Sequence, residues 1–173
     1  MLKRSSIGML VVALIVLMVI PAVSAKPGGI ERPFKATLTG EASWEFPGRC
    51  GNVTTVTDAT GKATHMGSVK ADWTHCPDND TINDGEMTLI AANGDELHGY
   101  YDYPGIDAGS PITFDGGTGR FANAVGEVLV HYDVIPVFWC EPADWNDEDA
   151  VFACMDFTVP WQWTATLTGT ISY

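Results

Sequence analysis

One pentapeptide, Ala-Thr-Leu-Thr-Gly, occurs twice in the chain, at 36–40 and again at 165–169. Each copy lies in a longer stretch, 34–46 or 161–172, in which apolar and polar residues largely alternate. This period of two is typical of a β-strand that turns one face to a core and the other to water. In an open sheet two such strands would leave unpaired edges, whereas pairing the first with the last closes the sheet. We therefore expect a closed barrel, with a β-sandwich as the alternative.

Further alternating runs lie between these two stretches and are separated by residues typical of turns. The sequence predicts strands at 34–46, 53–57, 63–75, 86–92, 96–103, 111–115, 126–138 and 156–172. Turns are expected at 58–61, 83–85 and 93–95 and in the glycine cluster at 116–119. One helical turn is expected, near 120–125. The predicted fold class is all-β, an antiparallel barrel of about eight strands.

Four glycines stand in the inward phase of the predicted strands, among apolar neighbours: Gly40, Gly67, Gly99 and Gly169. Glycine weakens a strand and normally marks a bend, a bulge or the close approach of another backbone. Because a small closed barrel needs such bends, these glycines favour closure of the sheet.

Residues 1–25 have the composition of a secretory signal peptide. Two basic residues precede an apolar run from Ile7 to Ile20, and small residues lead up to Ala25. The run is shorter than the roughly 20 residues that span a bilayer, which disfavours the alternative of an uncleaved anchor helix. We expect cleavage after Ala25, a single barrel domain at 26–173 without a membrane anchor, and a secreted or periplasmic location.

The 4 cysteines all follow this segment. An even number of cysteines in an exported chain is typical of disulfide bonds. Of the three possible pairings we expect the one between sequence neighbours, Cys50–Cys76 and Cys140–Cys154. The second bond would restrain a loop whose carboxylates repel one another. The alternative, a metal site built from thiolates, lacks the C-x-x-C spacing that such sites use.

The composition is acidic, with 22 Asp and Glu against 9 Lys and Arg and a formal net charge of −13. Such a chain lacks the cationic surface that binds nucleic acid or an anionic membrane. His65 and His75 share a phase but stand too far apart on a strand to share a metal ion. Acidic loops near 78–84 and 144–149 offer oxygen ligands without the spacing of an EF-hand. We expect no nucleic-acid partner, no metal and no cofactor.

Two short motifs resemble those of known exported barrels. They are Ala91-Ala-Asn-Gly-Asp95 and Phe114-Asp-Gly-Gly-Thr-Gly-Arg-Phe-Ala122, the second followed by Ala124 and Gly126. In these motifs the chain is similar to the small exported bacterial and archaeal barrels of the allene oxide cyclase-like and dirigent-like superfamily. The resemblance implies a barrel, and most of these exported relatives have no assigned function. No motif aligns the catalytic residues of the plant members with positions in this chain, so we assign no catalytic residue.

Aromatic residues gather in the inward phase of the predicted strands, and the chain carries 6 tryptophans. We expect five aromatic residues to line a ligand-binding pocket at one end of the barrel: Trp73, Tyr101, Tyr103, Trp161 and Trp163. Small barrels are either filled by side chains or hold one small ligand. Tyr and Trp would give such a pocket flat apolar walls with polar tips. The alternative is that these rings only pack the core.

These features leave two classes of function open. The first is a non-enzymatic barrel that binds a small apolar or aromatic ligand or acts structurally at the cell surface. The second, which the resemblance implies, is an isomerase or cyclase in which the barrel cavity steers a reactive substrate. The inward phases contain almost no charged or hydrogen-bonding residue apart from His65 and His75, which favours the first class.

Overall fold

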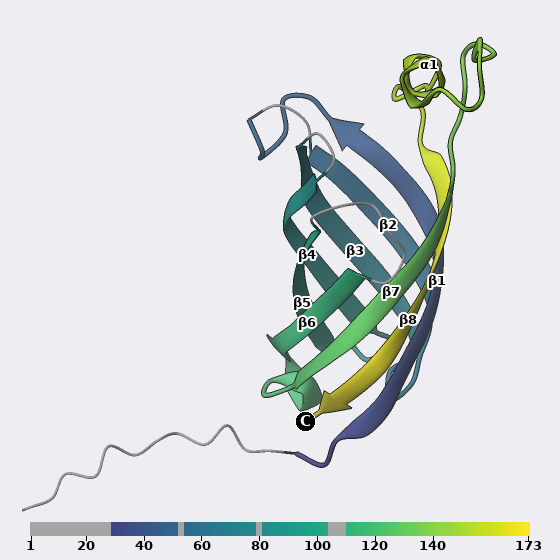
Figure 1. The fold of residues 1–173 in the computed structure, drawn as a ribbon. Helices are drawn as coiled ribbons and strands as arrows, with labels where there is room; N and C mark the ends of the chain where they lie inside the picture. Colours follow the sequence, from purple (N-terminus) through teal and green to yellow (C-terminus); the bar gives the residue numbers. More distant parts are fainter. Residues whose placement is uncertain (1–28, 52–53, 79–80, 104–109) are drawn as a thin grey trace, which may run out of the picture.

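The computed structural model describes residues 29–51, 54–78, 81–103 and 110–173, and it shows antiparallel strands closed into a barrel (Figure 1). The strands are β1 (Arg32–Glu45), β2 (Thr54–Ala63), β3 (Gly67–Asp78), β4 (Thr81–Ala91), β5 (Glu96–Tyr103), β6 (Ser110–Gly117), β7 (Val125–Ile135) and β8 (Trp161–Ser172). They follow one another around the barrel in chain order, and β8 pairs with β1. The predicted all-β fold and the predicted closure are confirmed.

The two repeated pentapeptides lie opposite each other where the barrel closes. Ala36 of β1 pairs with Leu167 of β8, and Leu38 pairs with Ala165. Because both copies share one phase, antiparallel pairing turns the apolar side chains of both to the interior. All four of these side chains are buried.

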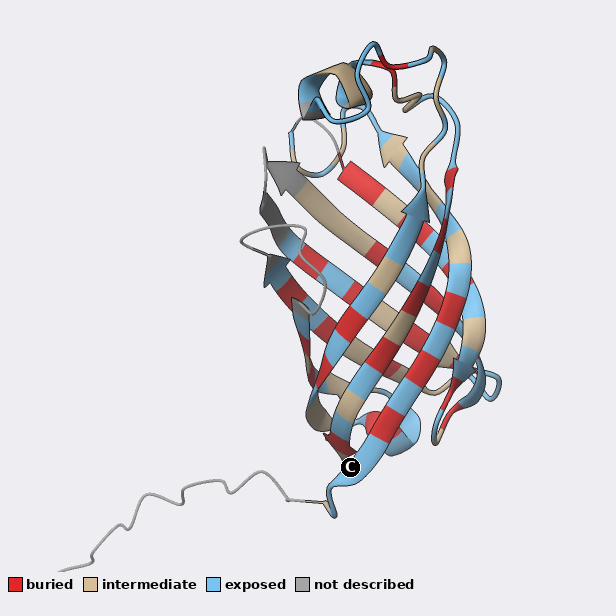
Figure 2. Ribbon diagram, turned by 45° about the vertical axis from the view of Figure 1, so that its right-hand side comes forward, coloured by how far each residue is buried: buried red, intermediate tan, exposed pale blue. Residues whose placement is uncertain are grey.

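Burial alternates along the strands, so that red and blue bands follow one another in Figure 2. In β1, Phe34, Ala36 and Leu38 are buried while the residues between them are exposed. Buried side chains from each of the eight strands meet in one core cluster inside the barrel. The alternation found in the sequence therefore separates the inside of the barrel wall from its outside.

Glycine allows neighbouring strands of this wall to approach closely. A Cβ placed on Gly169 would lie 2.1 Å from the carbonyl oxygen of Glu127 on β7, and one on Gly40 would lie 2.1 Å from that of Asp58 on β2. Both positions agree with the expected role of inward glycines in closing the barrel. The same expectation was wrong for Gly67, which is exposed and begins β3 with a positive φ of 75°.

The turn expected at 58–61 is absent, because these residues belong to the continuous strand β2. They pair with β1 on one side and with β3 on the other. The chain reverses later, at 64–66, where His65 has a φ of 66°. The turn expected at 83–85 is likewise an irregularity within β4, where the register with β5 shifts between Ile82 and Gly85.

One end of the barrel, which we call the η1 end, is closed by the short 3₁₀ helix η1 (Gly119–Phe121). The ring of Phe121 is 0% exposed and lies edge-on to the ring of Tyr173, with 5.0 Å between centroids. Outside this plug, Arg120 pairs with Asp95 of the β4–β5 turn at 3.5 Å. The helical turn expected near 120–125 therefore exists, one residue earlier, and it covers the core.

The wall of the barrel is least continuous at β6. Among the described residues, β5 pairs with β6 over 97–100, and the register shifts between His98 and Gly99. In the part of the chain that the structure describes, β6 pairs with β7 over residues 110–114. By contrast, β8 pairs with both of its neighbours over almost its whole length.

At the opposite end, which we call the α1 end, residues 136–160 leave the barrel between β7 and β8 and carry the helix α1 (Glu148–Ala153), drawn at the top of Figure 1. Asp147 caps this helix by accepting hydrogen bonds from the backbone N–H groups of Asp149 and Ala150. A loop closed by the Cys140–Cys154 bond was expected here, but its full length and its helix were not, because strands were expected at 126–138 and 156–172. β7 instead ends at Ile135, and β8 begins at Trp161.

Both predicted disulfides are confirmed. Cys50 bonds to Cys76 between the β1–β2 connection and β3, and Cys140 bonds to Cys154 within the excursion. Two disulfides indicate an oxidising, extracytoplasmic environment. Within the described ranges, no helix has the length and apolar character needed to cross a membrane. The predicted signal peptide at 1–25 lies outside the described residues.

Candidate ligand-binding site

Three of the five aromatic residues predicted to line a pocket meet inside the barrel: Trp73 of β3, Tyr101 of β5 and Trp163 of β8. The ring centroids of Trp73 and Trp163 are 4.9 Å apart, and those of Trp73 and Tyr101 are 6.4 Å apart. All three side chains are buried. Since β3 and β8 are not neighbours in the sheet, their rings meet across the interior. We call Trp73, Tyr101 and Trp163 the inner aromatic cluster.

The indole N–H groups of this cluster are buried without a hydrogen-bond partner. The side-chain nitrogens Nε1 of Trp73 and of Trp163 contact no acceptor within the described structure. The two residues are only 7% and 4% exposed. Buried donors are nearly always paired in proteins, so two unpaired donors on neighbouring rings are unusual.

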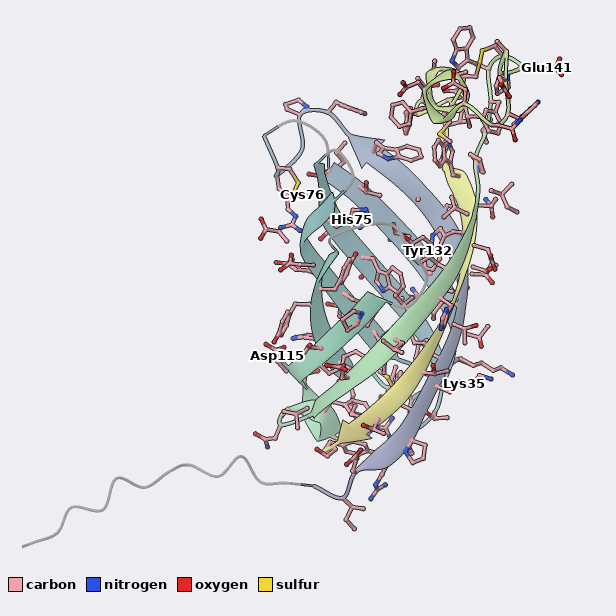
Figure 3. The ribbon with its side chains drawn as sticks, in the orientation of Figure 1. Lys35, His75, Cys76, Asp115, Tyr132 and Glu141 are labelled. Carbon is pink, nitrogen blue, oxygen red and sulfur yellow. A yellow bond between two sulfur atoms is a disulfide. The ribbon has the colours of Figure 1, made fainter. Side chains whose placement is uncertain are left out.

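His75 borders the inner aromatic cluster at the α1 end of β3, beside Cys76 (Figure 3). Its Nδ1 lies 2.9 Å from the hydroxyl oxygen of Tyr101, within hydrogen-bond distance. Burial lowers the pKa of His75 from 6.5 to about 4, and the positive charge of Arg49 contributes in the same direction. The ring is therefore uncharged at neutral pH.

This shift makes a pH dependence of stability measurable. Unfolded His75 takes up a proton near pH 6.5 and folded His75 only near pH 4, so the unfolded state binds more protons between these values. As the pH falls through this window, we expect His75 to reduce the free energy of unfolding by about 2 kcal/mol. Urea unfolding at pH 7 and at pH 4.5 should show this extra loss in the wild type and not in His75→Gln. An equal loss in both proteins would contradict the assignment.

Trp161 belongs to a different cluster, nearer the excursion. Its ring lies 4.5 Å from that of Trp44 and 4.9 Å from that of Phe157. Its indole N–H donates to the backbone carbonyl oxygen of Asp156 at 2.6 Å, so its polar tip is satisfied. Trp161 thus lies apart from Trp73, Tyr101 and Trp163, and a role in ligand binding stays a prediction for it. The side chain of Tyr103 lies outside the described residues.

Polar side chains that sequence reasoning missed also face the interior. Thr55 and Thr57 of β2 are buried and stand opposite His75 and Trp73 of β3. Tyr132 of β7 packs against the core, and burial raises the pKa of its hydroxyl. Thr55, Thr57 and Ala59 alternate along β2. A prediction of 58–61 as strand would therefore have indicated that the two threonines face the interior.

A charged groove of about 440 Å³ lies beside the inner aromatic cluster and shares Tyr101 with it. Arg49 spans this groove: its guanidinium lies 3.9 Å from the carboxylate of Glu86 and donates to the backbone carbonyl of Asp84. The backbone N–H of Asp84 in turn donates to the carboxylate of Asp102 at 2.9 Å. These charged side chains are exposed or partly exposed, so the groove is a polar rim next to a buried aromatic interior.

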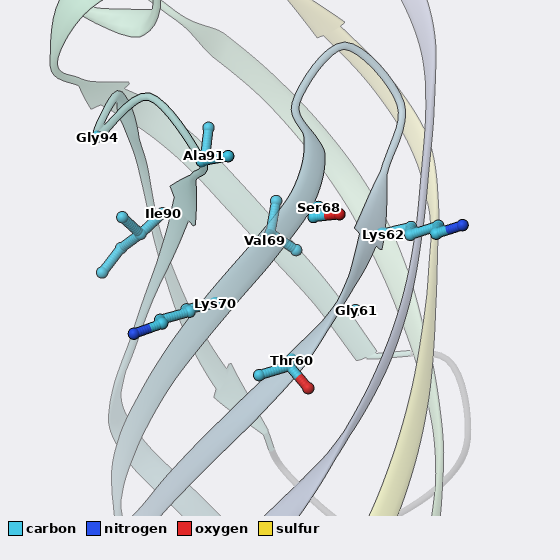
Figure 4. Close-up of a pocket in the computed structure, with 10 residues that line it drawn as sticks. Thr60, Gly61, Lys62, Ser68, Val69, Lys70, Ile90, Ala91 and Gly94 are labelled. Atoms are coloured by element: carbon cyan, nitrogen blue, oxygen red, sulfur yellow. The ribbon is translucent and has the colours of Figure 1, made fainter.

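A second groove, of about 700 Å³, lies over β2, β3 and β4 (Figure 4). Lys62 and Lys70 border it, and both side chains are exposed. None of the predicted ligand-binding residues lines this groove. We therefore do not assign it to the candidate site.

Metal-ligating side chains do not gather in the part of the chain that the structure describes. Within it, no three His, Cys, Asp or Glu side chains are placed to hold a metal ion. His65 lies in the β2–β3 turn with its Nε2 2.9 Å from the carbonyl oxygen of Pro33, whereas His75 borders the aromatic interior. The two histidines are thus separate, as their spacing predicted.

The inner aromatic cluster, its histidine neighbour and the polar rim together define the candidate site at the α1 end. Comparison with known proteins adds no relative to this description. No protein-family model, no curated protein and no solved structure matches the chain.

Proposed function

We propose that this protein is an exported barrel that binds one small apolar or aromatic ligand at the inner aromatic cluster, without transforming it. The observation that carries the proposal is the pair of buried, unpartnered indole N–H groups on the touching rings of Trp73 and Trp163. A core that served packing alone would have little reason to retain two such donors. Eight-stranded barrels have an interior that is either filled by side chains or holds one small ligand.

The chemistry of the site supports an apolar rather than a charged ligand. The rings of the cluster offer flat apolar faces. Thr54, Thr55 and Thr57 are the polar residues that are buried among the described ones, and no charged residue is. The charges of Arg49 and Glu86 stay at the rim, where solvent reaches them. A small apolar molecule would thus enter past a polar rim and stack within.

The isomerase or cyclase alternative places a reaction in the same interior. His75 and Tyr101, which lie within hydrogen-bond distance of each other, are the polar pair bordering that interior. The two functions differ in the fate of the ligand, which a binding protein returns unchanged. Binding experiments should therefore be followed by chromatography of the released ligand, and a converted product would favour the alternative.

A neutral fluorescent probe, N-phenyl-1-naphthylamine, should bind saturably at one site and show energy transfer from tryptophan. We expect Trp73→Leu to weaken this binding by about tenfold, because one stacking face is lost. The matched control is Trp139→Leu, in which the replaced ring is 68% exposed on the excursion, and it should bind as the wild type does.

Native mass spectrometry of the protein purified from its own host gives an independent check. A bound small molecule that is absent from the denatured chain supports the proposal. If no molecule co-purifies and the probe fails to bind, the barrel does not hold a ligand and a structural role remains.

A further inference from the structure

The two unpartnered donors also restrict which ligand fits. Resting on the proposed binding function, we infer that the ligand is an uncharged molecule whose carbonyl oxygen accepts hydrogen bonds from the indole N–H groups of Trp73 and Trp163. The inference concerns the class of ligand, an apolar or aromatic ketone, aldehyde or quinone, rather than the presence of a ligand.

An acceptor is required because both groups are donors only. The indole nitrogen carries one hydrogen and offers no lone pair to a donor. Neither Trp73 nor Trp163 finds an acceptor within the described structure, although other polar groups are close to the cluster. A hydrocarbon bound here would leave both donors unpaired, whereas a ligand with an acceptor oxygen would satisfy them.

The inference places one ligand oxygen between the two donors. The centroids of the two indole rings are 4.9 Å apart and the ring planes are inclined by 30°, so one ligand beside the cluster can contact both rings. A carbonyl oxygen carries two lone pairs and accepts two hydrogen bonds. A ring attached to this carbonyl would lie among the aromatic faces of the same cluster.

The surroundings favour an uncharged acceptor over a carboxylate. Asp84, Glu86 and Asp102 line the adjoining rim and repel an anion, although Arg49 offsets part of this charge. The residue next to the cluster that would otherwise attract an anion is His75, and burial lowers its pKa to about 4, so that it is neutral. Moving a carboxylate into this interior would require its desolvation without a buried cation as partner.

Two ligands of the same shape test the inference directly. They are 2-acetylnaphthalene, which has a carbonyl, and 2-isopropenylnaphthalene, in which a methylene group replaces the oxygen. Isothermal titration of the disulfide-bonded protein should show that the ketone binds about tenfold more tightly than the alkene, as expected for two added hydrogen bonds. Proton–nitrogen spectra should show two indole signals that shift with the ketone and less so with the alkene.

Conservative variants locate the effect. The double variant Trp73→Phe, Trp163→Phe keeps aromatic rings but removes both N–H donors, so it should bind the two compounds equally. Trp139→Phe makes the same chemical change at an exposed residue of the excursion and should keep the preference for the ketone.

The outcomes distinguish a failure of the carbonyl inference from a failure of the proposed binding function. If the wild type binds both compounds with equal affinity, the carbonyl inference is wrong and the binding function stands. If it binds neither compound, nor the naphthylamine probe, both are wrong. If the double variant keeps the preference for the ketone, the acceptor is held by other groups and the assignment to these tryptophans is wrong.

Discussion

Removing both disulfides is expected to lower the free energy of unfolding by about 6 kcal/mol, since each closes a loop worth about 3 kcal/mol or slightly more. The cysteine pairs are separated by 26 and by 14 residues, and the two loops do not overlap in sequence. Single domains are stabilised by about 5–15 kcal/mol in total, so such a loss would leave the barrel marginal. Urea unfolding of the oxidised wild type and of the fourfold Cys→Ser variant, followed by circular dichroism, measures the difference.

The two variants that each lack one disulfide should differ in which part of the protein unfolds first. Replacing Cys50 and Cys76 releases the β1–β2 connection from β3 and should destabilise the whole barrel. Replacing Cys140 and Cys154 should first unfold the excursion, because the six residues of α1 are too few to form a stable helix alone. A fourfold variant that unfolds at the wild-type urea concentration would show that neither bond contributes.

Replacing Phe121 by alanine is expected to lower the free energy of unfolding by about 4 kcal/mol, the usual cost of deleting a buried phenylalanine ring. Phe121 is fully buried and closes the η1 end against Tyr173. Its removal would leave a cavity between the core and the 3₁₀ helix that covers it. The backbone of η1 is held by its own hydrogen bonds, so it cannot collapse freely into that space.

Phe152→Ala is the matched control, because the same ring is 63% exposed on α1. Surface substitutions of this kind change stability by about 0.5 kcal/mol or less. Thermal or urea unfolding of both variants gives the comparison. If Phe121→Ala is no less stable than Phe152→Ala, then η1 does not plug the barrel in solution.

The closure of the barrel could be predicted because its signal is local. In β1 and β8 the alternation of apolar and polar residues is long, and the two copies of the pentapeptide share one phase. A shift of the pairing register by one residue would turn every buried side chain outward. Such a pattern therefore predicts both the strand and which of its faces is buried. The disulfide pairing followed from sequence neighbourhood in the same way.

The length of β2 could not be predicted, because a glycine at position 61 is compatible both with a turn and with the close approach of a neighbouring strand. Gly61 follows aspartate, alanine and threonine, which is typical of a turn. In the structure a Cβ on Gly61 would lie 2.0 Å from the carbonyl oxygen of Thr37, so this glycine serves the approach of β1. The difference depends on the neighbouring strand, which local sequence does not contain.

The sequence predicted which aromatic side chains face inward, but not how they contact one another. The phases of the strands indicated that Trp73, Tyr101 and Trp163 face inward. They did not indicate that Trp161 would bond to the backbone of Asp156, because this contact depends on the path of the excursion. Nor does a phase reveal whether a buried donor finds an acceptor, which decides the chemistry of the site.

The short pairing of β6 bears on how the barrel moves. A segment opens locally with a free energy set by the backbone hydrogen bonds and apolar contacts that it must break. Along β5 and β6 few ladder pairs hold the wall, whereas β8 is held on both sides. Thermal fluctuations should therefore part the wall at β6 before any other seam. Opening at this seam would expose the interior to solvent through the side of the barrel, a second route beside the one past the polar rim.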